Sequence, residues 1–286
     1  MELKIISVVG AGQMGRGIAQ VCAQSGFCVQ LYDENTPQLH KSLDFIKNQW
    51  NKGVEKNKWD TNHVQTWMQN LKILEGNQEW EMGLAKSDVV IEAIVENFQA
   101  KAKLFETLDK FAKKEAILCS NTSSISITKL AACTQRPSQV IGMHFMNPVP
   151  VMKLVEGIVG LQTSEQTLQI IKNLCEKLSK TFVQALDIPG FAVNRILMPM
   201  INEAIYVLYE GIASIADIDT AMKLGTNVPM GPLQLADFIG LDTCLAIMEV
   251  LYEGLGDTKY RPCPLLKQYV AAKRLGQKTK RGFYEY

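Results

Sequence analysis

The feature that most constrains the fold of this chain is a glycine-rich segment near its beginning, Gly10-Ala11-Gly12-Gln13-Met14-Gly15. An apolar, β-branched run precedes it at Ile5–Val9, and apolar residues at helical spacing follow over Ile18–Gln24. In dinucleotide-binding strand–turn–helix units, one glycine makes the tight turn, one lets the backbone approach the pyrophosphate and one lets the helix pack on the strand. The helix N-terminus then offers unpaired N–H groups to the phosphates. The segment predicts a dinucleotide site contacted by Gly10, Gly12, Gln13, Met14 and Gly15. The alternative is a glycine-rich turn that binds nothing.

Asp33 indicates which dinucleotide this would be. It follows a second strand-like run, Cys28–Tyr32, and lies about 20 residues beyond the glycines. A carboxylate at this position accepts hydrogen bonds from the adenosine ribose hydroxyls and repels a 2′-phosphate. The cofactor expected is therefore NAD rather than NADP.

The first two thirds of the chain alternate short apolar runs with helical patterns. Further strand candidates are 88–94, 116–120, 140–145, 153–158 and 181–185. Helical patterns join them over 97–113 and 166–180, the second opening near Ser164. Such alternation predicts βαβ units and a mainly parallel sheet. The fold class expected is α/β, with a Rossmann-like domain in front.

The pattern changes at Pro189-Gly190, after which the remaining segments are typical of helices. Apolar positions from 197 to 208 follow the i, i+3, i+4 rule, and Pro199 inside them is expected to kink the helix or force a local adjustment. Local signals predict a helix start at Ser214 with Asp217, a helix end at Gly225 and another start at Gly231-Pro232. We place the domain boundary near residue 186, with an NAD-binding domain over 1–186 and a helical domain for substrate binding and dimerisation over 187–286.

Composition argues against several classes of protein. The 286 residues carry a net charge of +1 and no five consecutive like charges, which disfavours nucleic acid or an anionic membrane as a partner. No run approaches the roughly 18 apolar residues that span a bilayer, and an export signal is not evident. The seven cysteines show no CxxC and no metal-like cluster. Free thiols in a reducing cytoplasm, with no bound metal, are expected.

His144 and Glu156 are the candidates for acid–base chemistry. His144 lies where the predicted strand 140–145 leaves the sheet, and open α/β sheets bind ligands beyond the carboxyl ends of their strands. Histidine titrates near neutrality and can take the proton of an alcohol as hydride leaves. Glu156 would fix its tautomer and stabilise the imidazolium. A purely structural strand-end histidine is the alternative.

Small polar residues follow another predicted strand, at Ser120-Asn121-Thr122-Ser123-Ser124. Their side chains are suited to binding substrate oxygens. Ser123 or Ser124 could equally cap the next helix, and the residues alone leave both interpretations open.

Together these segments resemble the 3-hydroxyacyl-CoA dehydrogenase family, and within it the short bacterial 3-hydroxybutyryl-CoA dehydrogenases. The matching segments follow the family's order over nearly the whole chain: VVGAGQMGRGIAQ (8–20), DVVIEAIVEN (88–97), SNTSSISIT (120–128), HFMNPVPVMKLVE (144–156), PGFAVNR (189–195), MGPLQLADFIGLDT (230–243) and RGFYEY (281–286). The resemblance implies reversible, NAD-dependent oxidation of an (S)-3-hydroxyacyl-CoA, such as 3-hydroxybutyryl-CoA, to the 3-ketoacyl-CoA.

The resemblance also implies roles for individual residues. His144 corresponds to the general acid/base and Glu156 to its orienting carboxylate. Ser123 and Asn194 correspond to residues that bind substrate oxygens, and Asn194, on the first helix of the second domain, implies an active site between the domains. Positions near the nicotinamide half of NAD are matched by Glu96, Lys101, Ser123 and Asn147.

Three lysines need separate mention. Lys56, in the basic stretch KNQWNKGVEKNKWD, is the best match for the family's contacts to CoA phosphates, and a solvated lysine at a helix end is the alternative. Lys278 matches a position that approaches the cofactor in relatives. Lys280 stands where the family usually has a glycine with positive φ, which leaves the shape of that turn open.

Two other functions remain alternatives: a dehydrogenase of a free hydroxy acid, and a non-catalytic NAD-binding protein. The basic residues around Lys56 favour an acyl-CoA substrate, and the intact set of Ser123, His144, Glu156 and Asn194 favours an enzyme. The apolar segments 199–209 and 247–252 predict a homodimer through the helical domain. A self-contained helical core is the alternative there.

Overall fold

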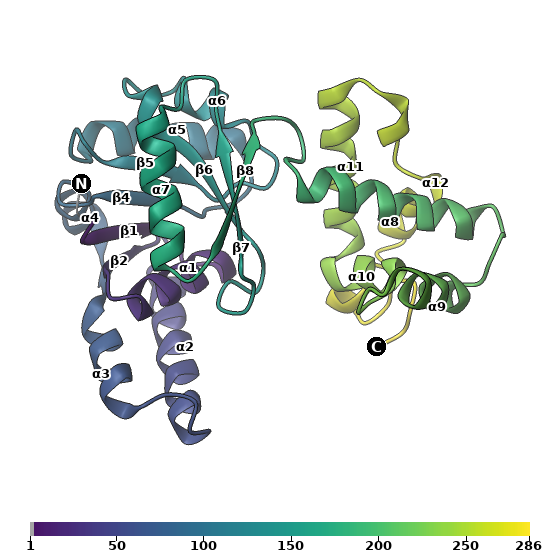
Figure 1. Cartoon of the computed structure of the whole chain (residues 1–286), viewed down its shortest axis with the longest axis horizontal. Coiled ribbons are helices and arrows are strands. Elements are labelled where there is room, and N and C mark those ends of the chain that lie inside the picture. The colour runs from purple at the N-terminus through teal and green to yellow at the C-terminus, as the bar shows by residue number, and fades with distance from the viewer. Residues whose placement is uncertain (1–2) are drawn as a thin grey trace. The chain divides into compact units, whose positions relative to one another are not determined.

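The computed structural model of the chain describes residues 3–286, and the chain divides after Asp187 into two compact units (Figure 1). The boundary expected from the sequence lies at residue 186. Each unit has its own hydrophobic core.

The first unit is built on one eight-stranded sheet. Its strands are β1 (Ile5–Val9), β2 (Cys28–Tyr32), β3 (Leu71–Leu74), β4 (Val89–Glu92), β5 (Ile117–Ser120), β6 (Val140–Phe145), β7 (Leu154–Val159) and β8 (Thr181–Leu186). Their spatial order is β3-β2-β1-β4-β5-β6-β7-β8. Every neighbouring pair is parallel except β6 with β7. This confirms the predicted α/β class and the mainly parallel sheet.

Burial along the strands follows from their place in the sheet. β4, β5 and β6 are buried at every residue, because central parallel strands are covered on both faces and therefore consist of continuous apolar runs. The edge strand β8 is largely exposed. In the middle of the sheet, β1 lies between β2 and β4. The strands β1, β4, β5 and β6 are neighbours that run parallel, so their carboxyl ends reach the same edge of the sheet.

Within residues 3–187, seven α-helices connect these strands. They are α1 (Gln13–Gln24), α2 (Thr36–Glu55), α3 (Thr61–Asn70), α4 (Gly76–Leu84), α5 (Phe98–Phe111), α6 (Ile127–Ala131) and α7 (Glu165–Lys177), with a short 3₁₀ turn η1 (Pro137–Gln139). The sequence patterns are helix-like around His40 and His63 but do not delimit α2 or α3, and they do not predict β3 or α4. Local signals for the first two helices exist, since the Asn35 and Asp60 side chains accept hydrogen bonds from the first-turn N–H groups of Gln38 and Asn62.

The helices α2 and α3 form a hairpin that extends away from the sheet (Figure 1). Indole rings pack between them: the Trp67 ring lies 5.9 Å from that of Trp50 and 5.4 Å, edge-on, from that of Trp59. Trp50 is fully buried. Aromatic burial of this kind stabilises a hairpin that the sheet alone does not support.

The second unit is built of helices and turns, with isolated antiparallel β-bridges near its end that join Gly276 to Arg281 and Arg281 to Glu285. Its helices are α8 (Val193–Tyr209), α9 (Ile215–Thr226), α10 (Pro232–Ile239), α11 (Leu241–Leu255), η2 (Thr258–Tyr260), α12 (Pro264–Ala271) and η3 (Gln277–Thr279). α8 continues through Pro199. The Ser214 hydroxyl caps α9, as predicted, by accepting the Asp217 N–H at 3.2 Å. Gly231-Pro232 opens α10, also as predicted.

The predicted helix end at Gly225 is wrong. α9 runs on to Thr226, and Asn227 ends it with φ +56° and ψ +37°. Asparagine adopts this left-handed conformation more readily than other non-glycine residues, so it serves where Gly225 was expected.

The turn before the C-terminus keeps a left-handed residue although the glycine is replaced: Lys280 has φ +60°. The segment that follows is held by the buried Asp237 carboxylate, which accepts the Phe283 and Tyr284 N–H groups at 2.9 Å each. These two bonds hold the tail against α10, to which Asp237 belongs.

Over residues 3–286, no helix is long and apolar enough to cross a bilayer. Within the same range, no three or more His, Cys, Asp or Glu side chains are grouped so that they could hold a metal ion.

Candidate active site

The glycine segment forms the turn between β1 and α1, and its glycines have different neighbours. Gly10 has φ +101°, and a Cβ there would lie 2.5 Å from the carbonyl oxygen of Ala93. A Cβ on Gly15 would overlap the carbonyl oxygen of Gly10. A Cβ on Gly12 would meet no described atom within 4 Å, and φ −67° is open to any residue. The fold therefore requires glycine at two positions, while at Gly12 only an approaching ligand would.

A cavity of about 520 Å³ lies beside this turn within the first unit. Its lining includes Gly10, Gly12, Tyr32, Asp33, Trp80 and Ile94. The Tyr32 and Trp80 rings stack with their centroids 4.5 Å apart. Asp33 accepts the Ala11 N–H at 2.6 Å and the Asn35 N–H at 2.8 Å. Because an ionised carboxylate has about four lone-pair sites, Asp33 can still accept hydrogen bonds from ribose hydroxyls.

His144 and Glu156 face each other across the antiparallel pair β6–β7. The strand register places them directly opposite, and His144 Nδ1 lies 2.8 Å from Glu156 Oε2. Both are buried, Glu156 completely. The structure thus confirms that this carboxylate reaches the imidazole, which the sequence left open. The other histidines, His40 and His63, are exposed, as predicted.

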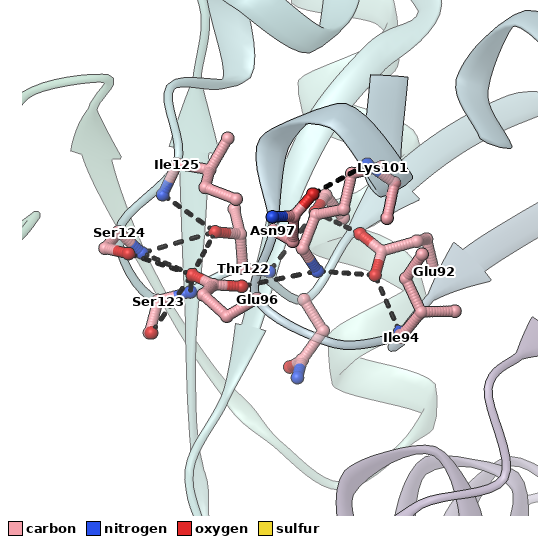
Figure 2. A network of polar contacts seen from close by, with 12 residues as sticks. Glu92, Ile94, Glu96, Asn97, Lys101, Thr122, Ser123, Ser124 and Ile125 are labelled. Atoms are coloured by element: carbon pink, nitrogen blue, oxygen red, sulfur yellow. Dashed lines mark hydrogen bonds and ion pairs between the residues drawn. The ribbon is translucent and has the colours of Figure 1, made fainter. Parts of the chain in front are cut away.

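Glu96 organises the loop after β5 (Figure 2). One of its oxygens, Oε1, accepts the N–H groups of Ser123 and Ser124 at 2.9 and 3.0 Å, and the Thr122 hydroxyl at 2.6 Å. Burial opposes the charge, but the ammonium of Lys101 and these hydrogen bonds keep the pKa of Glu96 below its ordinary value. The helix that follows is capped by Ser126. The alternative that Ser123 or Ser124 caps it is therefore wrong.

Lys101 lies behind Glu96. Its side chain is 1% exposed, and its ammonium lies 2.5 Å from Glu92 and 3.3 Å from Glu96. Glu92, the fully buried last residue of β4, is not among the residues that the sequence predicts for the site. The sequence does contain a signal for Glu92, which is an acidic residue at the end of the apolar run DVVIE. Because an unpaired buried charge is costly, a carboxylate in such a run predicts a buried cationic partner.

Asn147 lies on the loop between β6 and β7, which is joined to the glycine turn. Its side-chain oxygen accepts a hydrogen bond from Gln13 Nε2 at 2.9 Å, and Gln13 and Met14 open α1. The same loop is held by Lys180, whose buried ammonium donates to the carbonyls of Val149 and Met152 at 2.6 and 2.7 Å. Burial lowers the pKa of Lys180. Lys180 was not among the predicted site residues, and a lone lysine before a strand gives little signal.

Comparisons with known proteins identify the family of this chain. Residues 5–188 match the family described as 3-hydroxyacyl-CoA dehydrogenase, NAD binding domain, and residues 190–286 match its C-terminal domain. The chain belongs to the 3-hydroxyacyl-CoA dehydrogenase family. The family resemblance stated from the sequence is thereby confirmed.

Individual relatives of the family cover almost the whole chain. A protein of Bacillus subtilis named "Probable 3-hydroxybutyryl-CoA dehydrogenase" is 56% identical over 100% of this chain and 98% of its own. The 3-hydroxybutyryl-CoA dehydrogenase of Bradyrhizobium diazoefficiens is 52% identical over 99% and 96%. The crystal structure of (S)-3-hydroxybutyryl-CoA dehydrogenase from Ralstonia eutropha has a TM-score of 0.96, with 47% identity and coverage of 100% and 99%.

As in its family, the first unit of this dehydrogenase is an NAD-binding domain, and its residues fit NAD. Gly12 leaves open space, and α1 begins with Gln13-Met14-Gly15-Arg16, without an acidic side chain that would repel phosphate. Asp33 supplies the ribose acceptor.

The contacts described so far do not include three of the predicted residues, which are Lys56, Lys278 and Asn194. Lys56 is exposed at the C-terminal end of α2. In the second unit, Lys278 donates to Asp242 at 2.8 Å and to Thr243 at 3.0 Å, and Asn194 is buried near the start of α8. The ligand contacts implied for these three residues stay predictions.

The two kinds of glycine can be separated by mutation. Gly12→Ala should leave the melting temperature almost unchanged, because the added methyl meets no protein atom, yet weaken NAD binding at least about tenfold, or about 1.4 kcal/mol. Gly15→Ala should instead destabilise the protein by about 1–3 kcal/mol through overlap with the Gly10 carbonyl. Calorimetric NAD titration and thermal melting of both variants provide the measurement. Unchanged NAD affinity in Gly12→Ala would contradict the role given to the open space.

Proposed function

We propose that this protein catalyses the reversible, NAD-dependent oxidation of an (S)-3-hydroxyacyl-CoA, such as 3-hydroxybutyryl-CoA, to the 3-ketoacyl-CoA. The observation that carries the proposal is the buried His144–Glu156 pair at the sheet edge where β1 forms its glycine turn. Open α/β sheets bind their ligands at this edge. The substrate is suggested by the names of the relatives, which are 3-hydroxybutyryl-CoA dehydrogenases.

The His144–Glu156 hydrogen bond assigns different tasks to the two ring nitrogens. Since an ionised carboxylate only accepts hydrogen bonds, Glu156 holds the proton on Nδ1 and gives Nε2 the part of general base. As hydride leaves C3 of the substrate, Nε2 takes the proton of the 3-hydroxyl, and the C–O bond becomes a carbonyl. Glu156 stabilises the imidazolium that results. NAD, when bound, supplies the hydride-accepting chemistry.

Other residues bind and orient the substrate in this proposal. Ser123 and Asn194 bind its oxygens, and Lys56 contacts CoA phosphate. Support for Ser123 comes from the loop that Glu96 fixes after β5, at the same edge of the sheet as His144. Support for Lys56 is its exposed position among the basic residues around the end of α2.

The direct test is to mix the purified protein with NADH and acetoacetyl-CoA and to follow the loss of NADH absorbance. Parallel reactions contain NADPH, or free acetoacetate in place of the thioester. We expect rapid loss only with NADH and acetoacetyl-CoA. NADPH should not serve as the reductant, because Asp33 repels its 2′-phosphate. Equal rates with free acetoacetate would support a hydroxy-acid dehydrogenase instead. NAD binding without turnover of any acyl-CoA tried would support a non-catalytic protein.

The catalytic pair gives a second prediction. His144→Ala should lower kcat by about 10²–10⁴-fold, the usual contribution of a general base. Glu156→Gln should lower kcat at least about tenfold, because a glutamine amide can donate to Nδ1 and thereby favours the tautomer whose Nε2 already carries a proton. His40→Ala, at an exposed histidine outside the site, is the matched control. A loss of less than tenfold for a folded His144→Ala protein would exclude the assigned role.

We also infer a cytoplasmic homodimer that associates through the helical unit. The seven cysteines are free, and burial raises the pKa of Cys175 and Cys244 to about 12, as suits inert thiols in a reducing compartment. Large apolar side chains of the second unit are exposed in the single chain, among them Leu224 (81%), Ile196 (72%) and Ile212 (67%). Light scattering after gel filtration should give twice the 31.9 kDa mass of one chain. A monomer at micromolar concentration would contradict this.

A further inference from the structure

The loop between β6 and β7, residues 146–153, packs closely against α1. A Cβ added to Gly17 of α1 would lie 2.9 Å from the Cβ of Val149, which is buried. Only a residue without a side chain lets the two segments approach this closely. The Lys180 ammonium holds the same loop by donating to the carbonyls of Val149 and Met152. Close packing and charge-assisted hydrogen bonds therefore fix the loop beside the helix.

One polar contact joins this loop to the start of α1. Gln13 Nε2 donates to Asn147 Oδ1, and the two atoms lie 2.9 Å apart. Both side chains are exposed, so a ligand can reach them. The two ends of an asparagine amide differ, because its oxygen accepts hydrogen bonds and its nitrogen donates two. Since Gln13 engages the oxygen, the NH₂ group of Asn147 is the end left for a ligand, and no group within residues 3–286 accepts a hydrogen bond from it.

The position of this contact along the cofactor follows from the groups on either side of it. Gln13 begins α1, whose N-terminal N–H groups suit the pyrophosphate of NAD. Asn147 lies three residues beyond His144, which in the proposed function acts where hydride is transferred. In NAD, the nicotinamide riboside joins the pyrophosphate to the carbon that accepts hydride. Asn147 therefore lies beside this half of NAD, a step that rests on the proposed function.

The orientation of the Asn147 amide selects one acceptor on that half of the cofactor. A ribose hydroxyl both donates and accepts, so it can bond to an amide in either orientation. The carbonyl oxygen of the nicotinamide carboxamide only accepts and needs a donor. We infer that Gln13 is a positioning residue: it holds the Asn147 amide with its NH₂ group toward the carboxamide carbonyl of NAD. The Gln13 side chain acts on the nicotinamide only through Asn147.

Reversing the polarity of the Gln13–Asn147 hydrogen bond tests the inference. A lysine at position 13 only donates and keeps the amide in place, whereas a glutamate only accepts and draws the NH₂ group away from the cofactor. Gln13→Lys and Gln13→Glu are made in the wild-type chain and in an Asn147→Ala background. Comparing the two backgrounds removes the direct effect of the new charge on the ligand. Calorimetry gives the dissociation constants of NAD, of ADP-ribose and of the 3-acetylpyridine analogue of NAD, whose acetyl carbonyl only accepts.

The acetylpyridine analogue should respond most sharply. We expect Gln13→Glu to weaken its binding at least about fivefold more in the presence of Asn147 than in the Asn147→Ala background, a loss typical of one hydrogen bond. NAD should lose less, because its carboxamide can turn and offer its own NH₂ group to the Asn147 oxygen. ADP-ribose, which lacks the nicotinamide, should respond equally in both backgrounds. Gln13→Lys should show no dependence on the background with any of the three ligands.

Three results would overturn the inference. The first is an equal loss of analogue binding in both backgrounds for Gln13→Glu. The second is a Gln13→Lys protein whose loss depends on the background as strongly as that of Gln13→Glu. The third is the same background dependence for ADP-ribose as for the analogue, which would place the partner of Asn147 outside the nicotinamide.

The last residue of the same helix provides the matched control. Gln24→Glu should show no dependence on the background with any of the ligands. If a variant is partly unfolded, the dissociation constants of all its ligands rise by the same factor. The ratio of the analogue's dissociation constant to that of ADP-ribose in the same sample is then independent of the folded fraction and decides the case.

Binding measurements separate this inference from the proposed function. If the wild-type protein binds NAD but does not reduce acetoacetyl-CoA, the proposed function fails, while the calorimetric comparison still decides whether Gln13 orients Asn147. If the wild type is active and the analogue shows no dependence on the background, the inference fails alone.

Discussion

The antiparallel pairing of β7 on β6 is the constraint on which the chemistry of this protein depends. It places Glu156 opposite His144 on one face of the sheet. Because side chains alternate along a strand, a slip of one residue would turn Glu156 to the other face. Two contacts beyond the β6–β7 pairing stabilise its register. β8 pairs with β7 on its other side, and the Lys180 ammonium donates to the carbonyls of Val149 and Met152 in the loop between β6 and β7.

The same edge of the sheet gathers the remaining polar groups. β1 ends at the glycine turn, β4 at Glu92 and β5 at the loop of Ser123, and His144 is the last residue but one of β6. Each acid among them is compensated by a specific partner, as the cost of burying a charge demands. Glu92 has Lys101, and Glu156 has the imidazole. A polar network whose members are all satisfied is rigid, and rigid placement is what a general base and a substrate-binding hydroxyl require.

Much of this could be predicted from the sequence, for identifiable reasons. The central strands are predictable because strands buried on both faces are continuous apolar runs. The glycine turn is predictable because it lies between a strand pattern and a helix pattern, with Asp33 after the next strand. β3 was missed since four residues, LKIL, between two helices carry almost no periodic signal. The end of α9 was misplaced by two residues, because asparagine replaced the expected glycine in the left-handed conformation. The contact of Glu156 with His144 could not be derived, since it depends on strand register rather than on spacing.

Lys101 and Gly12 illustrate a further limit of sequence motifs. A motif contains residues that the fold requires and residues that the ligand requires, and it does not distinguish the two. Gly10 and Gly15 are required by neighbouring backbone atoms, whereas Gly12 has open space around it. Lys101 matches a family position near the cofactor, yet its buried ammonium is occupied by two carboxylates. Conversely, Lys280 stands in a left-handed turn where glycine is usual, and the tail stays in place because Asp237 holds it. Whether a motif residue serves the fold or the ligand follows from the atoms that surround it, and pattern alone does not contain that information.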